Sequence, residues 1–335
     1  MAKKLILCSV VKNFRKDKTM KLYKTMLVRT SNNFWEDCIP EEEVMDNYPR
    51  VRTRYFRPYF NCNMKSLERI LRKMSSCGLN SVLFDVGDSV KFKSRPDVGL
   101  PDALTPEQYK DILKLCRDLG LEPFPKLNFS SCHDAWLGRY SRMLSTAEYY
   151  SCCRDLIDET VEMFDGPALF HIGMDEEDFN NQKFYEYIVI RRNKLWWHDL
   201  NFLAECVKFA DSRPWVWSDK IWHCNLDEFK LNMPKYVLQS NWYYGPTFEL
   251  DQEKNRDAYR IKGFLDLNAL GYDQMPTGSN FMYPENFPQL VEFCQKNIEN
   301  IVGYMCFPCR GVLAKYEHEY IACAEVSQQA YAQLQ

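Results

Sequence analysis

The strongest sign of chemistry in the sequence is a run of four acidic residues, Asp175 to Asp178, directly after an apolar stretch that ends at Met174. Coulomb repulsion and partial burial both penalise crowded negative charge, so we expect at least one raised carboxyl pKa in this group. A carboxyl that keeps its proton near neutral pH can act as a general acid. An acidic loop on the protein surface is the alternative interpretation, and the run alone leaves both open.

Other polar and aromatic residues follow further apolar runs of the chain. The polar candidates for a binding site are Asp88, Asn128, His133, His171, Asp219, Tyr244 and Asp273. Phe, Trp and Tyr together make up 15% of the residues, and Trp217, Trp222 and Trp242 come beside these polar groups. Sugar rings present apolar faces for stacking and hydroxyls for polar contacts, so the mixture favours a carbohydrate pocket. Trp196, Trp197 and Trp215 are interpreted as packing residues.

Three helices are clear from apolar spacing and capping residues. An apolar stripe over residues 65–77 is closed by Gly78. The segments Thr105-Pro106-Glu107-Gln108 and Ser145-Thr146-Ala147-Glu148 have the pattern of capping boxes and open two more helices, which end near Gly120 and Phe164.

Between the helices lie short apolar runs that suit buried parallel strands. They are 55–60, 81–86, 122–127, 168–174, 215–218, 236–241, 271–275 and 301–307. Eight strands that alternate with helices predict an α/β fold, the (β/α)8 TIM barrel, whose active site lies at the carboxyl ends of the strands. We expect residues 1–50 to be a short N-terminal extension packed on a barrel of residues 51–335. A doubly wound sheet is the alternative, but no Gly-x-Gly-x-x-Gly follows a strand.

Composition excludes some classes of partner. The 335 residues include 43 Lys and Arg against 46 Asp and Glu, so we expect no nucleic-acid partner. No apolar run approaches the roughly 20 residues that span a bilayer, so no membrane association is expected. The 14 scattered cysteines indicate free thiols and a cytoplasmic protein. Export is the alternative, because Leu5–Val11 faintly resembles a signal segment. The oligomeric state is not indicated.

The segment His171-Ile172-Gly173-Met174-Asp175-Glu176 resembles the His-x-Gly-Gly-Asp-Glu signature of glycoside hydrolase family 20, the β-N-acetylhexosaminidases. Leu79-Asn80 with Asp88 is similar to the family's Leu-Asn and Thr-Asp-Asp stretch. Pro125-Lys126-Leu127-Asn128 with His133 resembles Pro-Glu-Ile-Asp…Pro-Gly-His. Trp217-Ser218-Asp219 and Gln239…Trp242 are similar to the Trp-Asp-Glu and Gln-x-Trp runs. The resemblance covers roughly residues 50–245 and is distant.

The resemblance implies a retaining, substrate-assisted glycosidase that needs no cofactor and no metal ion. Glu176 is then the general acid/base, and Asp175 orients the substrate's 2-acetamido group, whose carbonyl attacks the anomeric carbon. Asn128 and His133 are expected near Glu176, and Trp217 and Trp242 as walls of the acetamido pocket. Neighbouring residues of a strand point to opposite faces, so Asp175 and Glu176 serve together only if the strand ends or twists there.

Three parts of the family pattern are missing. The family's arginine after strand 1, which binds sugar hydroxyls, would fall near Tyr59, with Arg57 close but unaligned. Gly271–Asn280 replaces its Tyr-x-Asp after strand 7, and Phe307-Pro308-Cys309 replaces its Trp-x-Glu on strand 8. Glycosidase chemistry is therefore better supported than specificity for a terminal N-acetylhexosamine.

Two other functions remain open. A barrel that binds glycans without cleaving them would also lose sugar-binding residues, although the retained Glu176 favours an enzyme. A metal-dependent hydrolase would need Cys132-His133, His171 and His223-Cys224 to meet, at spacings that fit no ligand template. Cys306-Phe307-Pro308-Cys309 is a lone Cys-x-x-Cys without a second ligand pair, and we interpret it as packing.

Overall fold

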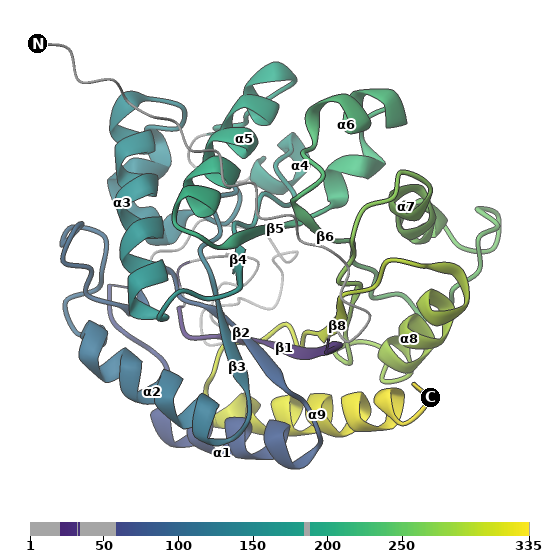
Figure 1. Cartoon of the computed structure of the whole chain (residues 1–335), viewed down its shortest axis with the longest axis horizontal. Coiled ribbons are helices and arrows are strands. Elements are labelled where there is room, and N and C mark those ends of the chain that lie inside the picture. Colours follow the sequence, from purple (N-terminus) through teal and green to yellow (C-terminus); the bar gives the residue numbers. More distant parts are fainter. Residues whose placement is uncertain (1–20, 32, 34–57, 184–187, 335) are drawn as a thin grey trace, which may run out of the picture.

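The structure of the protein is a computed structural model in which residues 21–31, 33, 58–183 and 188–334 are described. In these ranges, parallel strands alternate with helices around a central axis, as Figure 1 shows. The fold is a (β/α)8 TIM barrel, which confirms the predicted fold class.

The strands form one eight-stranded parallel sheet in the order β6-β5-β4-β3-β2-β1-β8-β7. Isolated bridges between Gln239 and Gln274 and between Trp242 and Thr277 join β6 to β7 and complete the ring. The strands are β1 Tyr23–Arg29, β2 Ser81–Asp85, β3 Glu122–Lys126, β4 Leu169–His171, β5 Arg213–Trp217, β6 Leu238–Ser240, β7 Thr277–Gly278 and β8 Gly303–Cys306.

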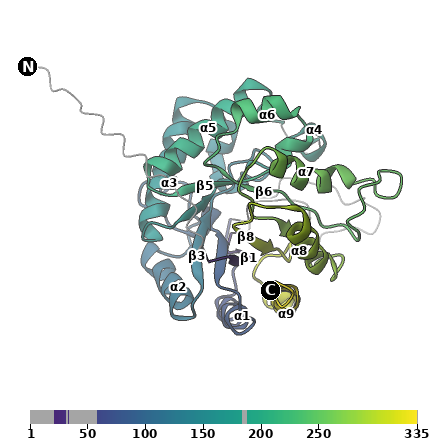
Figure 2. The same cartoon turned by 45° about the vertical axis from the view of Figure 1, so that its right-hand side comes forward.

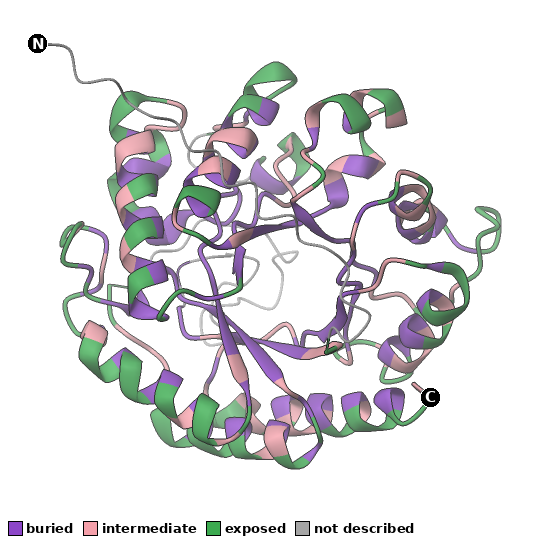
Figure 3. Ribbon diagram, viewed as in Figure 1, coloured by how far each residue is buried: buried purple, intermediate pink, exposed green. Residues whose placement is uncertain are grey.

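The helices surround the sheet and bury the side that faces it, as the purple inner faces in Figure 3 show. Figure 2 shows the same layer from another side, with α1 next to α9, in agreement with their contacts. They are α1 Met64–Ser76, α2 Pro106–Asp118, α3 Ala147–Met163, α4 Phe179–Gln182, α5 Lys194–Phe209, α6 Leu226–Asn232, α7 Ala258–Ala269, α8 Asn286–Asn297 and α9 Glu317–Tyr331; short 3-10 helices are η2 Gly87–Ser89, η3 Ala135–Arg142, η4 Asp219–Trp222 and η5 Ala314–Tyr316.

The capping residues set the helix starts. The capping box predicted at α2 is present, with Thr105 accepting from the Gln108 amide and the Gln108 side chain accepting from the Thr105 amide. At α3 the cap is Thr146, one residue later than the predicted box begins. Ser145 instead has a φ of 62° and donates a hydrogen bond to Asp199 on α5.

The first strand lies elsewhere than predicted. Tyr23–Arg29 pairs with β2 on one side and β8 on the other, so the barrel boundary predicted at residue 50 is wrong for this segment. Residues 58–60 form no strand, and 55–57 lie outside the described residues, as does most of the predicted extension. Tyr23–Arg29 was missed because Lys24 and Arg29 interrupt its apolar character.

The seventh strand is displaced as well. The apolar run at 271–275 predicts strand 7, but β7 consists of Thr277–Gly278, paired with β8. Asp273 therefore comes before the strand instead of after it. Its carboxylate accepts a hydrogen bond from Arg213, the first residue of β5, 2.9 Å away. This is the amino end of the barrel, opposite the expected site.

The barrel interior is filled by apolar side chains from alternate positions of the strands. This inner core includes Leu27, Leu83, Phe124, Leu169, Trp215, Trp217, Leu238, Trp242, Met275, Val302, Met305 and Phe307. The twelve described cysteines are free thiols, and no helix in the described part of the chain is long and apolar enough to cross a membrane.

Candidate active site

The four acidic residues after β4 have different roles. The Glu177 carboxylate is buried and forms an ion pair with Arg191, 2.8 Å away. Asp178 caps α4 by accepting a hydrogen bond from the Asn181 amide at 3.0 Å. Glu177 and Asp178 therefore hold the loop, and only Asp175 and Glu176 remain for chemistry.

The backbone between β4 and α4 is not extended, which brings two consecutive carboxylates to one side. Gly173, Met174 and Glu176 have positive φ angles of 74°, 76° and 55°. For Met174 and Glu176 this conformation costs of order 1–3 kcal/mol each and is typical of functional sites. β4 thus ends before Asp175 and Glu176, which allows the two carboxylates to act together.

His133 lies between the two carboxylates. Its Nε2 is 3.2 Å from Asp175 Oδ2 and 3.5 Å from Glu176 Oε2, and its side chain is buried. Burial alone would lower the pKa of His133, but the charges of Asp175 and Glu176 and their hydrogen bonds outweigh it and raise the pKa to about 9. His133 is therefore a cation at neutral pH that bridges both acids.

Asp175 is fixed as an anion. Asn128 Nδ2 donates to Asp175 Oδ1 at 2.9 Å, and the Ser130 hydroxyl donates to the Asp175 carbonyl. Burial would raise the pKa of Asp175, yet the positive charge and hydrogen bond of His133, the charge of Lys126 and the Asn128 amide hold it well below the usual range.

Glu176 is held through its backbone while its carboxylate stays partly open. Its amide donates to Asp219 Oδ2 at 2.8 Å, and its carbonyl accepts from the Cys132 thiol and the Asn181 side chain. The side chain is 19% exposed, in contrast to the buried His133. Glu176 can therefore meet a ligand without moving its main chain.

We expected a raised carboxyl pKa within the acidic run, but the carboxyl concerned is that of Asp219, which contacts the run from another loop. Burial, then the charges of Asp175 and Glu176, raise the pKa of Asp219 to about 8. Asp219 therefore keeps its proton at neutral pH. It starts η4, directly after β5, and thus reaches the same end of the barrel.

Aromatic side chains lie at the same end. Trp217 ends β5, and its ring is 4.7 Å from that of His171. Trp242, after β6, stacks on Tyr244 with ring centroids 5.1 Å apart. Burial raises the pKa of Tyr244 well above its usual value, and the charges of Cys309, Glu176 and Asp175 add to the shift, so the phenol is near both acids.

His171 and Asp88 support the site from within. His171 is buried between Trp215 and Trp217, and its Nδ1 accepts from the Gly173 amide at 2.9 Å. Burial and then the Lys126 charge hold the pKa of His171 well below its usual value.

Asp88 is buried on η2. It accepts hydrogen bonds from Ser31 Oγ at 2.6 Å and Asn33 Nδ2 at 2.7 Å. Burial, against these hydrogen bonds, raises its pKa to about 6. Asp88 therefore ties the loop after β1 to the loop after β2. Of the predicted residues, Asp273 alone lies at the other end of the barrel.

Sequence reasoning missed Arg29 and Lys126. Arg29 ends β1, and its guanidinium carbon is 4.3 Å from the centre of the Phe307 ring. An arginine after strand 1 was expected near Tyr59, which is 50% exposed. The misplaced first strand hid Arg29. Lys126 ends β3 and pairs with Asp85 at 2.6 Å; it was read only as part of a motif.

The residues of the metal alternative do not meet as a group. The Cys132 thiol donates to the Glu176 carbonyl, and His171 is enclosed by tryptophans. Among the described residues, the set close enough to share an ion is His133, Asp175 and Glu176, whose ligand atoms lie within 4.8 Å of one another. A cation there would have to displace the proton of His133.

The Cys-x-x-Cys segment belongs to packing between β8 and α9. Cys306 is buried with its sulfur 3.1 Å from that of Cys323. Burial raises the pKa of Cys309 to about 11, against the opposing charge of Arg29. A thiol of this kind is protonated and a poor nucleophile or metal ligand.

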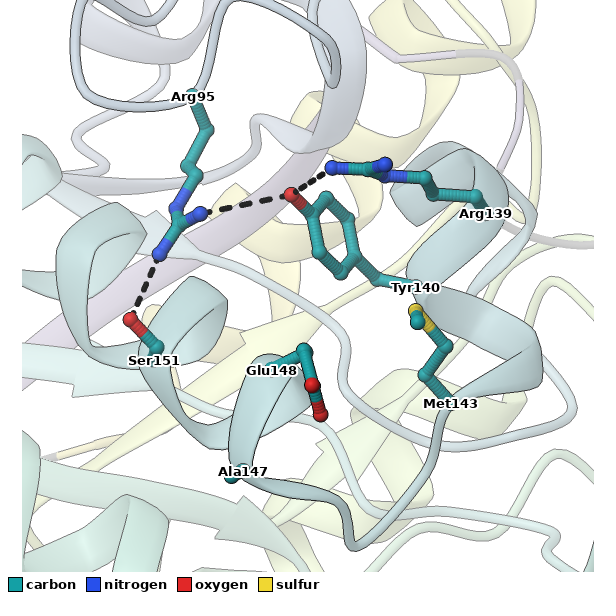
Figure 4. Close-up of a pocket in the computed structure, with 7 residues that line it drawn as sticks. All are labelled: Arg95, Arg139, Tyr140, Met143, Ala147, Glu148 and Ser151. Atoms are coloured by element: carbon teal, nitrogen blue, oxygen red, sulfur yellow. Dashed lines mark hydrogen bonds between the residues drawn. The ribbon is translucent and has the colours of Figure 1, made fainter.

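A separate cavity of about 370 Å³ lies between η3 and the start of α3, shown in Figure 4. Arg95 and Arg139 both donate to the Tyr140 hydroxyl in its wall. Each arginine is already paired, with Asp155 and Asp97 respectively. The cavity contains neither Asp175 nor Glu176 and offers no unpaired arginine charge.

Solved structures with the same fold come from the family indicated by the sequence. An exo-β-N-acetylglucosaminidase of glycoside hydrolase family 20 from Vibrio harveyi superposes with a TM-score of 0.56 at 14% identity, over 91% of this chain and 54% of that one. The fold is that of the family 20 barrel. The N-acetyl-β-hexosaminidase of Streptomyces plicatus gives 0.61 at 11% identity, over 92% and 62%.

Dispersin B gives a TM-score of 0.54 at 15% identity, over 81% of this chain and 96% of its own. The chain thus spans about half the length of the Vibrio enzyme and nearly all of Dispersin B. No family model and no curated protein sequence matches the chain. The likeness is therefore one of fold.

Proposed function

We propose that the protein is a retaining glycoside hydrolase that uses the 2-acetamido group of its substrate as the nucleophile. The observation that carries the proposal is the contact of one buried histidine with two consecutive carboxylates, both of them partly exposed. When two neighbouring carboxyl groups lie in different environments, one can donate a proton while the other stays an anion.

In the proposed reaction, Glu176 first donates its proton to the glycosidic oxygen as the bond to the anomeric carbon breaks. The acetamido carbonyl oxygen attacks that carbon and forms an oxazolinium ion. Asp175 accepts the acetamido N–H and balances the positive charge. Glu176, now a carboxylate, takes a proton from a water molecule as the water oxygen attacks the anomeric carbon and opens the oxazolinium ring. The sugar is released with its anomeric configuration retained.

The surrounding residues bind the sugar. Trp217, Trp242 and Tyr244 offer aromatic faces for the apolar side of the ring and the acetamido methyl. Arg29, at the end of β1, is placed to bind ring hydroxyls, the role of the arginine that follows strand 1 in the resembling family. Asp219, protonated near neutral pH, holds the Glu176 amide without adding a third negative charge.

Aryl glycosides of both anomers, with and without the 2-acetamido group, test the proposal directly. We expect hydrolysis of 2-acetamido substrates only. Cleavage of 2-hydroxy glycosides alone would show that a carboxylate, and not the acetamido group, is the nucleophile.

Glu176→Gln tests the acid/base role. We expect loss of hydrolysis with substrate binding retained in calorimetry. Asp178→Asn is the matched control, because it lies in the same acidic run and asparagine also caps helices; we expect its kcat within about twofold of the wild type. A wild type that binds glycans and cleaves none would instead identify a carbohydrate-binding barrel.

The metal-dependent alternative is separated by chelation. We expect EDTA to leave hydrolysis unchanged. Loss of activity with EDTA and its return with Zn²⁺ would assign the reaction to a metal held by His133, Asp175 and Glu176.

We also propose a cytoplasmic location, supported by the free thiols at the twelve described cysteines, which suit a reducing compartment. Cell fractionation tests it, and recovery outside the cell would favour export.

A further inference from the structure

The cavity between η3 and α3 has a hydrogen-bond donor in its wall that the protein itself does not use, the hydroxyl of Tyr140 (Figure 4). This oxygen accepts hydrogen bonds from Arg95 at 3.4 Å and from Arg139 at 2.9 Å. A hydroxyl has two lone pairs and one proton, so with both lone pairs occupied it can only donate. Tyr140 is 2% exposed, and its proton forms no hydrogen bond with another described residue.

A second unused donor in the wall is the Nε–H of Arg95. The Nε atom is buried and has no partner in the described part of the chain. The two terminal nitrogens of the same guanidinium contact Asp155, Ser151 and Tyr140. A buried donor without an acceptor destabilises the protein and calls for an explanation, such as a ligand that supplies the acceptor.

The cavity also offers an acceptor and an apolar surface. Glu148, in the first turn of α3, is exposed, and its carboxylate forms no ion pair or hydrogen bond with a described residue. Met143, at the end of η3, adds a partly buried apolar side chain to the wall. A ligand of this cavity therefore meets two donors, one carboxylate acceptor and one apolar side chain.

The charges of the wall identify the class of ligand. The guanidinium of Arg95 forms an ion pair with Asp155, and that of Arg139 lies 3.0 Å from Asp97. Glu148 is then the unbalanced charge and repels an anion, while the two guanidinium groups repel a cation. A neutral molecule that both donates and accepts hydrogen bonds, and has an apolar face, fits all of these groups. A sugar ring has these properties.

Size and position agree with a sugar site. The volume of about 370 Å³ is near the lower end of the roughly 300–1,000 Å³ that is typical of small-molecule pockets. η3 follows His133 in the connection after β3, and Arg95 lies in the connection after β2. In a TIM barrel these connections lie at the carboxyl ends of the strands, so the cavity is on the same face as the candidate active site.

We propose that this cavity is a second, non-catalytic binding site for a neutral sugar unit of a glycan. It holds a long glycan on the face of the barrel that carries Asp175 and Glu176. The proposal goes beyond the function proposed above and does not depend on it, because a barrel that binds glycans without cleaving them would use the same site.

Carbon-13 methyl NMR of labelled methionine tests the proposal, because the Met143 methyl group reports on the cavity itself. Met143→Leu assigns the signal. The probes are three neutral trisaccharides, N,N′,N″-triacetylchitotriose, cellotriose and maltotriose, added to the Glu176→Gln variant so that none is consumed. We expect at least one of them to shift the Met143 signal until the site is saturated.

Variants of the wall show whether the sugar is in the cavity. Tyr140→Phe removes the donated hydrogen bond and should weaken binding about tenfold, as should Glu148→Ala. Ala147→Trp adds a bulky side chain at an exposed position of the wall and should abolish the shift, even if Tyr140→Phe does not fold. Glu162→Ala, exposed in the last turn of the same helix, is the matched control and should bind as before.

A Met143 signal that none of the three trisaccharides moves would overturn the sugar site. A shift of the same size and affinity in Ala147→Trp would overturn it as well, because the sugar would then bind elsewhere. These outcomes differ from failure of the proposed function. A wild type that cleaves no glycoside refutes the hydrolase, whereas the Met143 titration still decides whether the cavity binds a sugar.

Discussion

Replacement of Gly173 by alanine tests whether the loop after β4 must approach β3 closely. A Cβ at this position would lie 1.8 Å from Asn128 Oδ1 and 2.8 Å from the Asn128 Cα. The backbone contact cannot move away as a side chain can, so the loop or β3 must shift. Gly173 also has a φ of 74°, which disfavours alanine.

Gly120 separates these two effects, because it has the same φ of 74° and nothing within 4 Å of its added Cβ. Gly120→Ala should cost about 1 kcal/mol of unfolding free energy, from backbone conformation alone. Gly173→Ala should cost a further 1–3 kcal/mol or so for overpacking. Urea denaturation of the two variants gives the difference.

Gly173→Ala should also reduce catalysis, because the clash of the added Cβ moves Asn128 away from Asp175. A hydrogen bond to a charged group contributes about 1.5–3 kcal/mol, which corresponds to roughly ten- to hundredfold in kcat. Rates on an aryl 2-acetamido glycoside should therefore fall by that factor in Gly173→Ala and stay near wild type in Gly120→Ala. Equal stability and equal rates of the two alanine variants would refute the described packing.

Three further predictions concern pH and the buried ion pairs. Because the pKa of His133 is raised to about 9, its stabilising contribution is complete below about pH 6.5 and is lost as pH rises through 9. In His133→Gln, the free energy of unfolding should therefore depend less on pH between about 6.5 and 9 than in the wild type. The pKa of Asp219 is raised to about 8, so its ionisation makes the free energy of unfolding of the wild type fall between about pH 4 and pH 8. Asp219→Asn should therefore be more stable than the wild type at pH 7 but not at pH 4. A difference in unfolding free energy that is the same at both pH values would contradict this. Glu177→Gln should lower the free energy of unfolding in urea by about 3–5 kcal/mol, because it leaves the buried Arg191 guanidinium without the Glu177 carboxylate. The double variant Glu177→Gln/Arg191→Met should lower it by less than Glu177→Gln does. A single variant as stable as wild type would show that the pair does not hold the loop.

Sequence reasoning found the acidic run but could not assign its members. Which carboxyls turn toward His133 depends on the positive φ angles of Met174 and Glu176, and neither residue type signals such an angle. Nothing in the sequence indicated that Glu177 pairs with Arg191, which lies fourteen residues later and without a recognisable spacing.

The barrel was predictable because its helices carry clear apolar stripes and capping residues. The strand ends were less so. β7 has two residues, so no periodicity could locate it, and Asp273 was assigned to the wrong end. β1 contains Lys24, Thr25 and Arg29, which made it less apolar than the aromatic run at 55–60, and so Arg29 was overlooked.

The join between β6 and β7 has a mechanical consequence. The ring of strands is continuous by regular pairing everywhere except here, where isolated bridges at Gln239 and Trp242 complete it. Amide protons along this seam should exchange with solvent before those of β1 and β2, since fewer neighbouring bonds must break for it to open. Because Trp242 belongs to this seam and stacks on Tyr244, any opening of the seam would move both aromatic side chains.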